Sequence, residues 1–454
     1  LQRFVNFMNN PDEKTAAEQF GTQDKYFGVC VLLATMPGLP MFGHGQVEGF
    51  REKYGMEYRR AYWDEPVDDG LVRGHRQWIF PLLKRRSLFS GAERFTLYTP
   101  RAADGSIVED VFAYSNGRGD QRALVLYHNR HSTTAVQIKE AVPIATEDGS
   151  LLVRQLADEL LVEEQHDTAY LRLYDLMADV WYLRSCRTIR EEGLHSLLGP
   201  YQSQVFLHIG VVQASPEEPW DQLCHLLNGA GVPSLDEALA EVRHATLIER
   251  FATLLDMMGS ETSRSCLSRA LRQVMAELPL LVTPAVATRH VRLGVTRFFA
   301  FEALPLRRIL RTLRRCGIDR LLLPCSQQSV QTARMLLLME GLLALLPAGS
   351  LTSLGLARRM VTFVAGQRIE RGDTSLTADM MQAVAVACRH CREQRQGSLV
   401  PALLRDPRLT AFLMIHTDQG ITWFNKERFE LLVAWMVLRG LIAAWQGERV
   451  NIPD

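Results

Sequence analysis

The sequence lacks a run of apolar residues that is both long enough and sufficiently free of charge to span a bilayer. Its richest apolar run, Met335 to Pro347, contains Glu340, and the apolar stretch from Leu432 to Trp445 contains Arg439. A membrane-spanning helix needs about 20 consecutive apolar residues. We therefore interpret both runs as buried helices of a folded domain and expect no membrane partner.

The sequence also lacks an excess of charge of either sign. Its 51 Lys and Arg residues equal its 51 Asp and Glu residues, so the formal net charge is +0. Nucleic-acid and membrane-surface binding usually depend on a basic excess or a block of like charges. This balance provides no argument for either partner, and we expect no nucleic-acid partner.

Cysteine is scarce, with 8 residues in 454, most of them far apart. The dense cysteine framework of a small secreted domain is therefore absent, which favours reduced thiols and a cytoplasmic protein. Leu1 falls inside the first predicted strand, so we expect the true N-terminus to lie upstream. The residues from Leu1 onward therefore do not exclude a signal peptide. Cys388 and Cys391 have the spacing of half a zinc site, but no second pair accompanies them, so we predict neither a metal nor a cofactor.

The apolar and turn patterns divide the chain into three parts. Residues 1–90 alternate predicted strands with helices, one helical between Glu13 and Thr35 and one between Leu71 and Phe89. Residues 91–215 contain short β-rich runs separated by turn sequences such as Asn116 to Asp120, which predicts an antiparallel sandwich. Residues 216–454 are predicted to be helical. The predicted fold class is therefore α/β, then all-β, then all-α.

One predicted helix of the third part has a basic face. Five arginines recur on one side of it, and leucine and isoleucine occupy the other: Arg307, Arg308, Arg311, Arg314 and Arg315. Such a face is typical of a solvated amphipathic helix. The alternative is an anionic partner, such as a second subunit or a phosphorylated ligand. We expect this domain to serve in packing or oligomerisation.

Polar residues follow two predicted strands near the start of the chain. The first segment is Phe7-Met8-Asn9-Asn10-Pro11-Asp12, and the second runs from Pro37 to Gln46. Barrel enzymes place their chemistry at the C-terminal ends of parallel strands. Asp12 is therefore a catalytic candidate, and Asn10 and His44 are candidate substrate contacts.

Each candidate has a structural alternative. Asp12 precedes Glu13-Lys14-Thr15, where an aspartate N-cap stabilises a helix by about 1 kcal/mol. His44 is alternatively a buried histidine held by hydrogen bonds. The aromatic residues between Phe50 and Trp63 either stack on sugars or pack over the mouth of the site.

Both segments resemble motifs of the α-amylase superfamily, glycoside hydrolase family 13. The first resembles the strand-7 motif Phe-x-x-Asn-His-Asp, with Asn10 and Asp12 on its Asn and Asp. The second resembles the strand-8 motif Gly-x-Pro-x-x-x-x-Gly-x-Glu, with Gly38, Pro40 and Gly45 in register. The resemblance covers residues 1–215. It implies the last βα units of a (β/α)8 barrel in residues 1–90 and a β-sandwich in 91–215. The α-helical domain in 216–454, predicted from its pattern alone, is appended to them.

The resemblance also implies a function. Asp12 falls on the carboxylate that stabilises the transition state, in a retaining hydrolase or transglycosylase whose substrate is α-glucan or an oligosaccharide. The family's nucleophile and acid/base belong to strands 4 and 5, which are expected before Leu1, so the 454 residues alone should be inactive. His44 is a hypothetical replacement donor, because Pro11 stands where the family has His.

Two departures leave other functions open. Pro11 replaces the motif's His, and Val47 replaces its Glu. An Asn-x-Pro-Asp sequence looks similar to maltosyltransferases that use a sugar phosphate. A non-catalytic, amylase-like scaffold or binding protein is the other alternative, because a fold does not determine a function.

Overall fold

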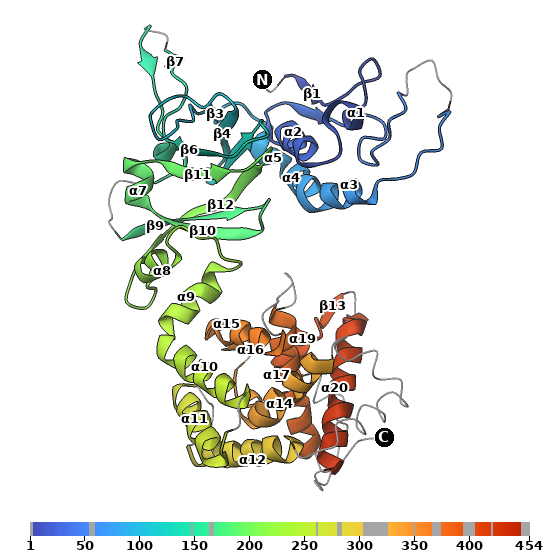
Figure 1. The fold of residues 1–454 in the computed structure, drawn as a ribbon, viewed down its shortest axis with the longest axis vertical. Helices are drawn as coiled ribbons and strands as arrows, with labels where there is room; N and C mark the ends of the chain where they lie inside the picture. The colour runs from blue at the N-terminus through green and yellow to red at the C-terminus, as the bar shows by residue number, and fades with distance from the viewer. Residues whose placement is uncertain are drawn as a thin grey trace. The chain divides into compact units, whose positions relative to one another are not determined.

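The computed structural model describes most of the chain and places it in two compact units, Leu1–Leu235 and Asp236–Asp454 (Figure 1). The described residues are 3–53, 60–146, 149–162, 168–259, 262–278, 284–302, 326–347, 350–365, 374–393, 405–418 and 421–445. The predicted basic face at residues 307–315 lies outside them. Residues 216–235, predicted to begin the helical part, are grouped with the first unit.

The first unit begins with two parallel strands, β1 (Val5–Phe7) and β2 (Leu39–Met41), in which Val5 pairs with Leu39. Two helices connect them, α1 (Ala16–Phe20) and α2 (Asp24–Thr35). The predicted strand–helix–strand unit is therefore present. Its helical part is divided because Gly21 ends α1 with a φ of 75°, a left-handed conformation that glycine adopts without a steric cost.

The helix predicted between Leu71 and Phe89 is also divided. It consists of α3 (Asp69–Gly74), the π-helical turn η1 (His75–Ile79), α4 (Phe80–Lys84) and α5 (Arg86–Phe89). Pro81 lies two residues after the π-helical turn and has no backbone N–H to donate, which interrupts regular α-helical hydrogen bonding. Such π-helical turns are frequent at functional sites.

A six-stranded antiparallel sheet follows, in the order β10-β9-β12-β5-β4-β3. Its strands are β3 (Thr96–Leu97), β4 (Val111–Arg118), β5 (Gln121–His128), β9 (Ala169–Asp175), β10 (Val180–Ser185) and β12 (Ser203–Gln213). A separate antiparallel pair consists of β6 (Thr134–Ile138) and β11 (Leu194–Leu198). Strands β10 and β11 were not predicted, because the sequence of neither strand shows a clear alternation of buried and exposed residues.

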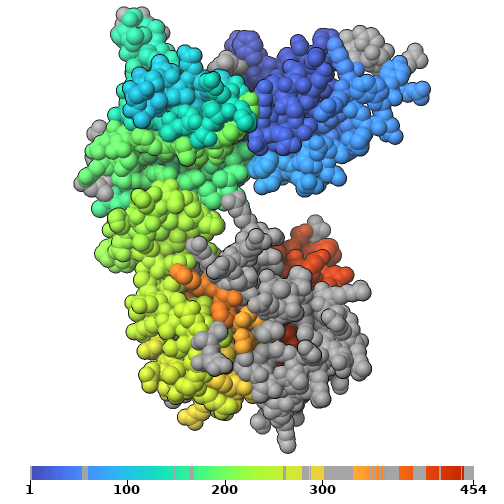
Figure 2. All heavy atoms as spheres, viewed as in Figure 1, coloured from blue at the N-terminus to red at the C-terminus, as the bar shows by residue number. Residues whose placement is uncertain are grey.

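Short elements complete the first unit. These are the hairpin strands β7 (Ile144–Ala145) and β8 (Leu151–Leu152), and the helices α6 (Leu156–Glu159), α7 (Cys186–Glu191) and α8 (Trp220–Leu227). The β7–β8 hairpin projects from the unit (Figure 2), and Leu151 on it is 69% exposed. Strand β8 and the four-residue α6 both lie between Gly149 and Val162.

The central strands of the six-stranded sheet are buried on both faces. On β5, Leu124 and Leu126 belong to a cluster that includes Val136 of β6 and Leu194 of β11. The alternate residues of β5, such as Val125, belong to a second cluster that also contains residues of α2 and α4. Side chains alternate between the faces of a strand. The sheet therefore packs against helices on one face and against the β6–β11 pair on the other.

The second unit consists mainly of helices. They are α9 (Leu235–Arg243), α10 (Ala245–Gly259), α11 (Arg264–Glu277), α12 (Pro284–Glu302), α14 (Ser326–Leu343), α15 (Ser350–Ser353), α16 (Leu356–Ala365), α17 (Thr374–Glu393), α19 (Pro407–Phe412) and α20 (Lys426–Trp445). The all-α prediction misses one hairpin, β13 (His416–Asp418) with β14 (Ile421–Trp423). Its β-branched residues Thr417, Ile421 and Thr422 favour extended backbone.

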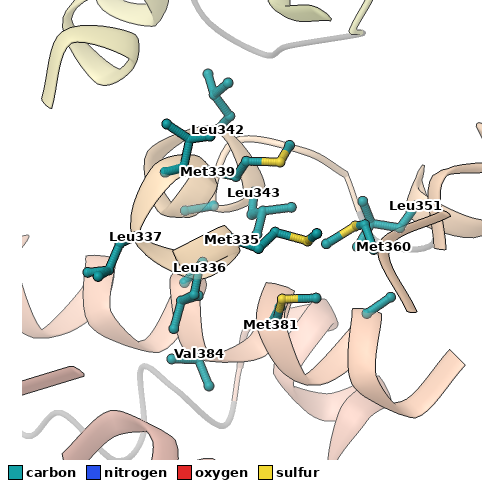
Figure 3. Close-up of a cluster of buried hydrophobic side chains, with 14 of the residues drawn as sticks. Met335, Leu336, Leu337, Met339, Leu342, Leu343, Leu351, Met360, Met381 and Val384 are labelled. Atoms are coloured by element: carbon teal, nitrogen blue, oxygen red, sulfur yellow. The ribbon is translucent and has the colours of Figure 1, made fainter. Parts of the chain in front are cut away.

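Helix α14 lies at the centre of the second unit. Its side chains from Met335 to Leu343 contact residues of α15, α16 and α17, such as Leu351, Met360 and Met381 (Figure 3). A helix that is apolar all round is usually buried. The prediction that Met335 to Pro347 forms a core helix is confirmed up to Leu343, where α14 ends.

Candidate functional site

The candidate site is a pocket at the C-terminal ends of β1 and β2. The strands are parallel and Phe7 pairs with Met41, so the segments that follow them leave the sheet at the same edge. These segments enclose a pocket of about 200 Å³. It is lined by Asn9, Asn10, Pro11, Glu13, Thr15, Met41, Phe42, Gly43, His44, Glu52 and Lys53.

Asn10 lines this pocket and shapes the turn after β1. Its Oδ1 accepts hydrogen bonds from the backbone N–H groups of Asp12, at 2.9 Å, and Glu13, at 3.0 Å. An asparagine that bonds to its own backbone two residues on produces a tight turn. Its Nδ2 has no hydrogen-bond partner in the described part of the chain, which leaves two N–H groups for a ligand.

Asp12 is exposed and is not itself one of the lining residues, although Pro11 and Glu13 on either side of it are. Its carbonyl oxygen accepts a 2.8 Å hydrogen bond from Nζ of Lys53. The N-cap of α1 is Thr15, whose Oγ1 accepts from the N–H of Glu18. The alternative that Asp12 caps this helix is therefore wrong, and its carboxylate is exposed beside the pocket.

His44 lines the opposite segment of the pocket. Its side chain is exposed, and its ring centroid lies 6.3 Å from that of Phe50. The alternative of a buried histidine is wrong. The structure thus brings Asn10 and His44 to one pocket from positions 34 residues apart in the sequence, because β1 and β2 are neighbours.

Close backbone approach explains one glycine of the second segment. A Cβ atom on Gly43 would overlap the side chain of Asn9, which is only 6% exposed. Oδ1 of Asn9 is buried and has no partner among the residues described. Gly43 therefore lets the two segments meet over a buried amide, a contact that a larger residue would separate.

Behind the pocket lies a hydrogen-bonded group that the sequence analysis missed. The side-chain Oε1 of Gln46 accepts a 3.1 Å hydrogen bond from the N–H of Gly43. The backbone carbonyl oxygen of Gln46 accepts one from the hydroxyl of Tyr26 at 2.8 Å. The hydroxyl of Tyr26 also lies 2.8 Å from Nε2 of His75, the first residue of η1. The local sequence gave no signal for His75, because Arg73, Arg76 and Gln77 beside it are polar and exposed.

Burial determines the ionisation of this group. His75 is fully buried, and burial lowers its pKa to about 4. Burial also raises the pKa of Tyr26 well above its usual range, and raises that of the neighbouring Cys30 to about 12. All three side chains are therefore neutral at pH 7, so they support the pocket loop and supply no charge to it.

The aromatic loop after the pocket is held by a carboxylate. Glu52 accepts hydrogen bonds from the backbone N–H groups of Tyr62, at 2.8 Å, and Trp63, at 3.0 Å. The two residues are 70% and 60% exposed, respectively. Both roles expected of this loop, stacking on sugars and packing over the mouth of the site, therefore stay predictions.

Two further features were searched for within the described residues. No group of three or more His, Cys, Asp or Glu residues there is arranged to hold a metal ion. Among the same residues, no helix combines the length and apolarity required to cross a membrane.

No known family model matches the chain, and no curated protein matches it either. Solved structures match in part. An α-amylase from Geobacillus thermoleovorans, complexed with acarbose, is 14% identical with a TM-score of 0.32, over 47% of this chain and 40% of that one. A debranching enzyme from Nostoc punctiforme, soaked with acarbose, is 12% identical with a TM-score of 0.28, over 45% of this chain and 34% of that one.

A gamma-CGTase from alkalophilic Bacillus clarkii is also similar, at 18% identity and a TM-score of 0.28, over 46% of this chain and 27% of that one. The chain thus spans less than half the length of each of these solved structures.

Proposed function

We propose that this chain is part of a retaining, α-amylase-like glycoside hydrolase or transglycosylase that acts on α-glucan. One observation supports this most directly: Asn10 and His44 line a pocket at the ends of two parallel strands, and Asp12 is exposed next to it. In this proposal Asp12 stabilises the positive charge that develops on the sugar, while Asn10 and His44 contact its hydroxyl groups.

We further propose that β1 and β2 are the last strands of a (β/α)8 barrel. One face of this pair is apolar and exposed: Val5 is 48%, Phe7 46% and Leu39 64% exposed. Parallel sheets are almost always covered on both faces. Further strands that bury this face would complete a barrel and supply the nucleophile and the acid/base, without which the 454 residues should be inactive.

The remaining parts complete the proposed organisation. Residues 1–90 are the barrel end, and residues 91–215 form a β-sandwich that packs on it. The helical residues after position 216 form a packing or oligomerisation module. Light scattering of the chain with and without the second unit would test the last point, because an oligomerisation module should be required for any mass above that of a monomer.

The test of the catalytic role is a kinetic comparison in the natural full-length protein. Asp12→Asn should lower kcat on maltoheptaose by about 10²–10³, the usual cost of removing one group that stabilises a transition state. His44→Ala should lower turnover less, since it removes one hydroxyl contact. Asp120→Asn, which changes an exposed carboxylate in a hairpin turn, is the matched control. Unchanged kcat in Asp12→Asn would refute the proposed role.

One observation favours a second candidate, a maltosyltransferase that uses a sugar phosphate. Lys53 lines the pocket and brings a cation beside Asp12. Phosphate groups are commonly bound by such a point charge. Tighter binding of maltose 1-phosphate than of maltose, lost in Lys53→Gln, would favour this candidate. Absence of turnover with every glucan would instead favour a non-catalytic scaffold.

A further inference from the structure

A second pocket lies in the first unit, and it shares no lining residue with the strand-end pocket. It has a volume of about 350 Å³. One wall comes from α2 and η1, through Asp24, Phe27 and Trp78. The other comes from the turns that precede β10 and β12 and from the first residue of β12, and it includes Tyr201, Gln202 and Ser203. Helices and sheet turns from distant parts of the sequence therefore build it together.

The apolar part of this pocket is aromatic. The rings of Phe27 and Trp78 meet edge to face, with centroids 5.0 Å apart. On the other wall, Nζ of Lys25 lies 5.9 Å from the ring centroid of Tyr201. Tyr201 has a φ of 50°, which is uncommon for a residue with a side chain and costs about 1–3 kcal/mol. Such strain persists where the surrounding structure or a function requires that side-chain position.

The walls of the second pocket also carry polar groups that lack partners. Nε1 of Trp78 and Oγ of Ser203 are buried, and neither has a hydrogen-bond partner in the described ranges. A buried polar atom left without a partner costs about 1–3 kcal/mol. A ligand hydroxyl can accept from an indole N–H and can exchange hydrogen bonds with a serine.

Two exposed side chains extend the polar surface. Oε1 of Gln202 accepts from the N–H of Gly199 at 2.7 Å, which leaves its Nε2 as a donor. The carboxylate of Asp24 is exposed at the start of α2 and is an acceptor. The ammonium of Lys25, next to Asp24 on α2, offsets its negative charge, so the pocket has no net charge to attract an ionic ligand. A neutral ligand with an apolar face and several hydroxyl groups matches these walls best.

We propose that this pocket is a second saccharide-binding site, which holds a short stretch of α-glucan apart from the strand-end pocket. The choice of α-glucan rests on the proposed function, whereas the preference for a neutral saccharide rests on the pocket itself. The sugar's apolar face lies against Trp78 or Tyr201, which have the amphipathic rings suited to this. Its hydroxyl groups pair with Trp78 Nε1, Ser203 Oγ and Gln202.

The test is calorimetric titration of the full 454-residue chain with maltotriose, with saturation-transfer NMR as a second readout. Trp78→Phe keeps an aromatic ring but removes the N–H, and should weaken binding about 5–10-fold, the effect of one lost hydrogen bond. Gln202→Ala, which changes an exposed residue, should weaken it similarly. Trp423→Phe is the matched control, because Trp423 is a 53% exposed tryptophan of the second unit.

Wild-type affinity for maltotriose in folded Trp78→Phe and Gln202→Ala would overturn the proposal. Absence of any binding up to about 20 mM would also overturn it. Asn10→Ala and His44→Ala separate this site from the proposed function, since they should leave maltotriose binding at the second pocket intact. If those two variants abolish all binding, the second site is wrong and the strand-end proposal stands. If Asp12→Asn leaves turnover unchanged while Trp78→Phe weakens binding, the strand-end proposal is wrong and the second site stands.

Discussion

The hydroxyl group of Tyr26 lies 2.8 Å from Nε2 of His75, and it donates its hydrogen to the carbonyl oxygen of Gln46. A tyrosine hydroxyl has one hydrogen, so Nε2 of His75 must be the donor to Tyr26. Nδ1 of His75 is then the unprotonated nitrogen. It is buried without a partner in the described part of the chain, among aromatic rings that include Phe27 and Phe42.

This arrangement predicts loss of stability on acidification. The pKa of His75 is lowered from 6.5 to about 4, so between these values the unfolded chain binds a proton that the folded chain does not. Stability contributed by neutral His75 is therefore lost as the pH falls from 6.5 to 4. His75→Gln keeps a donor for Tyr26 and should reduce this loss by up to about 3 kcal/mol.

The measurement is hydrogen exchange of peptides from α2 and η1 between pH 7 and pH 4.5, corrected for intrinsic rates. His195→Gln is the control, because the side chain of His195 is 59% exposed. Parallel loss of protection in wild type and His75→Gln would contradict the prediction.

The contribution of Asp175 to stability should depend on pH in the opposite direction to that of His75. Burial raises its pKa from 3.8 to about 6, although the N–H groups of Met177 and Val205 bond to its Oδ1 at 3.0 and 3.3 Å. Because the folded state holds the proton more tightly, stability falls as the pH rises from 4 to 6. Asp175→Asn retains Oδ1 and should be more stable than wild type above pH 6 by about 1–3 kcal/mol.

Urea unfolding of the first unit at pH 4 and pH 8 would measure this difference. The two proteins should be similar at pH 4 and diverge at pH 8, whereas Asp120→Asn should follow wild type throughout. A less stable Asp175→Asn at pH 8 would show that the ionised carboxylate is required by its two backbone donors.

Replacing Gly28 by alanine should destabilise the protein, although helix propensity alone predicts the reverse. Alanine is favoured over glycine inside a helix by about 1 kcal/mol. A Cβ atom on Gly28 of α2 would, however, overlap the ring of Tyr127 on β5. Forcing extra volume into a packed core costs about 1–3 kcal/mol. Gly28→Ala should therefore lower the Tm, whereas Gly91→Ala, which has no neighbouring atom within 4 Å, should not. A higher Tm in Gly28→Ala would refute this packing.

Substitution of Glu340 should cause a large loss of stability in the second unit. It is fully buried on α14, with Nε of Arg439 at 2.5 Å and a guanidinium nitrogen of Arg297 at 3.5 Å. Removing one partner of a buried ion pair costs about 3–5 kcal/mol, because uncompensated charge stays buried. Glu340→Gln should therefore strongly destabilise this unit in guanidinium unfolding. Glu430→Gln, which breaks a 3.7 Å surface pair with Lys426, should cost less than about 0.5 kcal/mol.

Local features of the fold were predictable because their causes lie within a few residues. The last helix begins after Asn425, a residue type favoured at helix N-caps, and Oδ1 of Asn425 accepts from the N–H of Arg428 at 2.9 Å. The hairpin between β4 and β5 follows the glycine-rich turn, with Arg118 opposite Gln121. The strands β10 and β11 were not predictable, because their pairing with distant strands outweighs their weak local pattern.

The candidate site likewise contains residues that the sequence predicted and residues that it missed. Asn10, Asp12 and His44 were predicted from strand ends and from a family resemblance, and the structure places Asn10 and His44 at one pocket with Asp12 beside it. Thr15 as the helix cap was missed, because Asp12 and Thr15 are both favourable N-cap residues and only the backbone decides between them. The roles proposed for the three residues stay predictions.

The sequence by itself determined the helices and strands that have a clear local pattern, such as the last helix and the β4–β5 hairpin, and where polar residues follow strands, since these depend on neighbours along the chain. Only the tertiary structure decided which distant residues meet. It paired β1 with β2, buried His75 against Tyr26, and set Trp78 opposite Tyr201. The physical reason is that packing and burial act between residues close in space, and the spacing of residues along a chain does not specify those contacts.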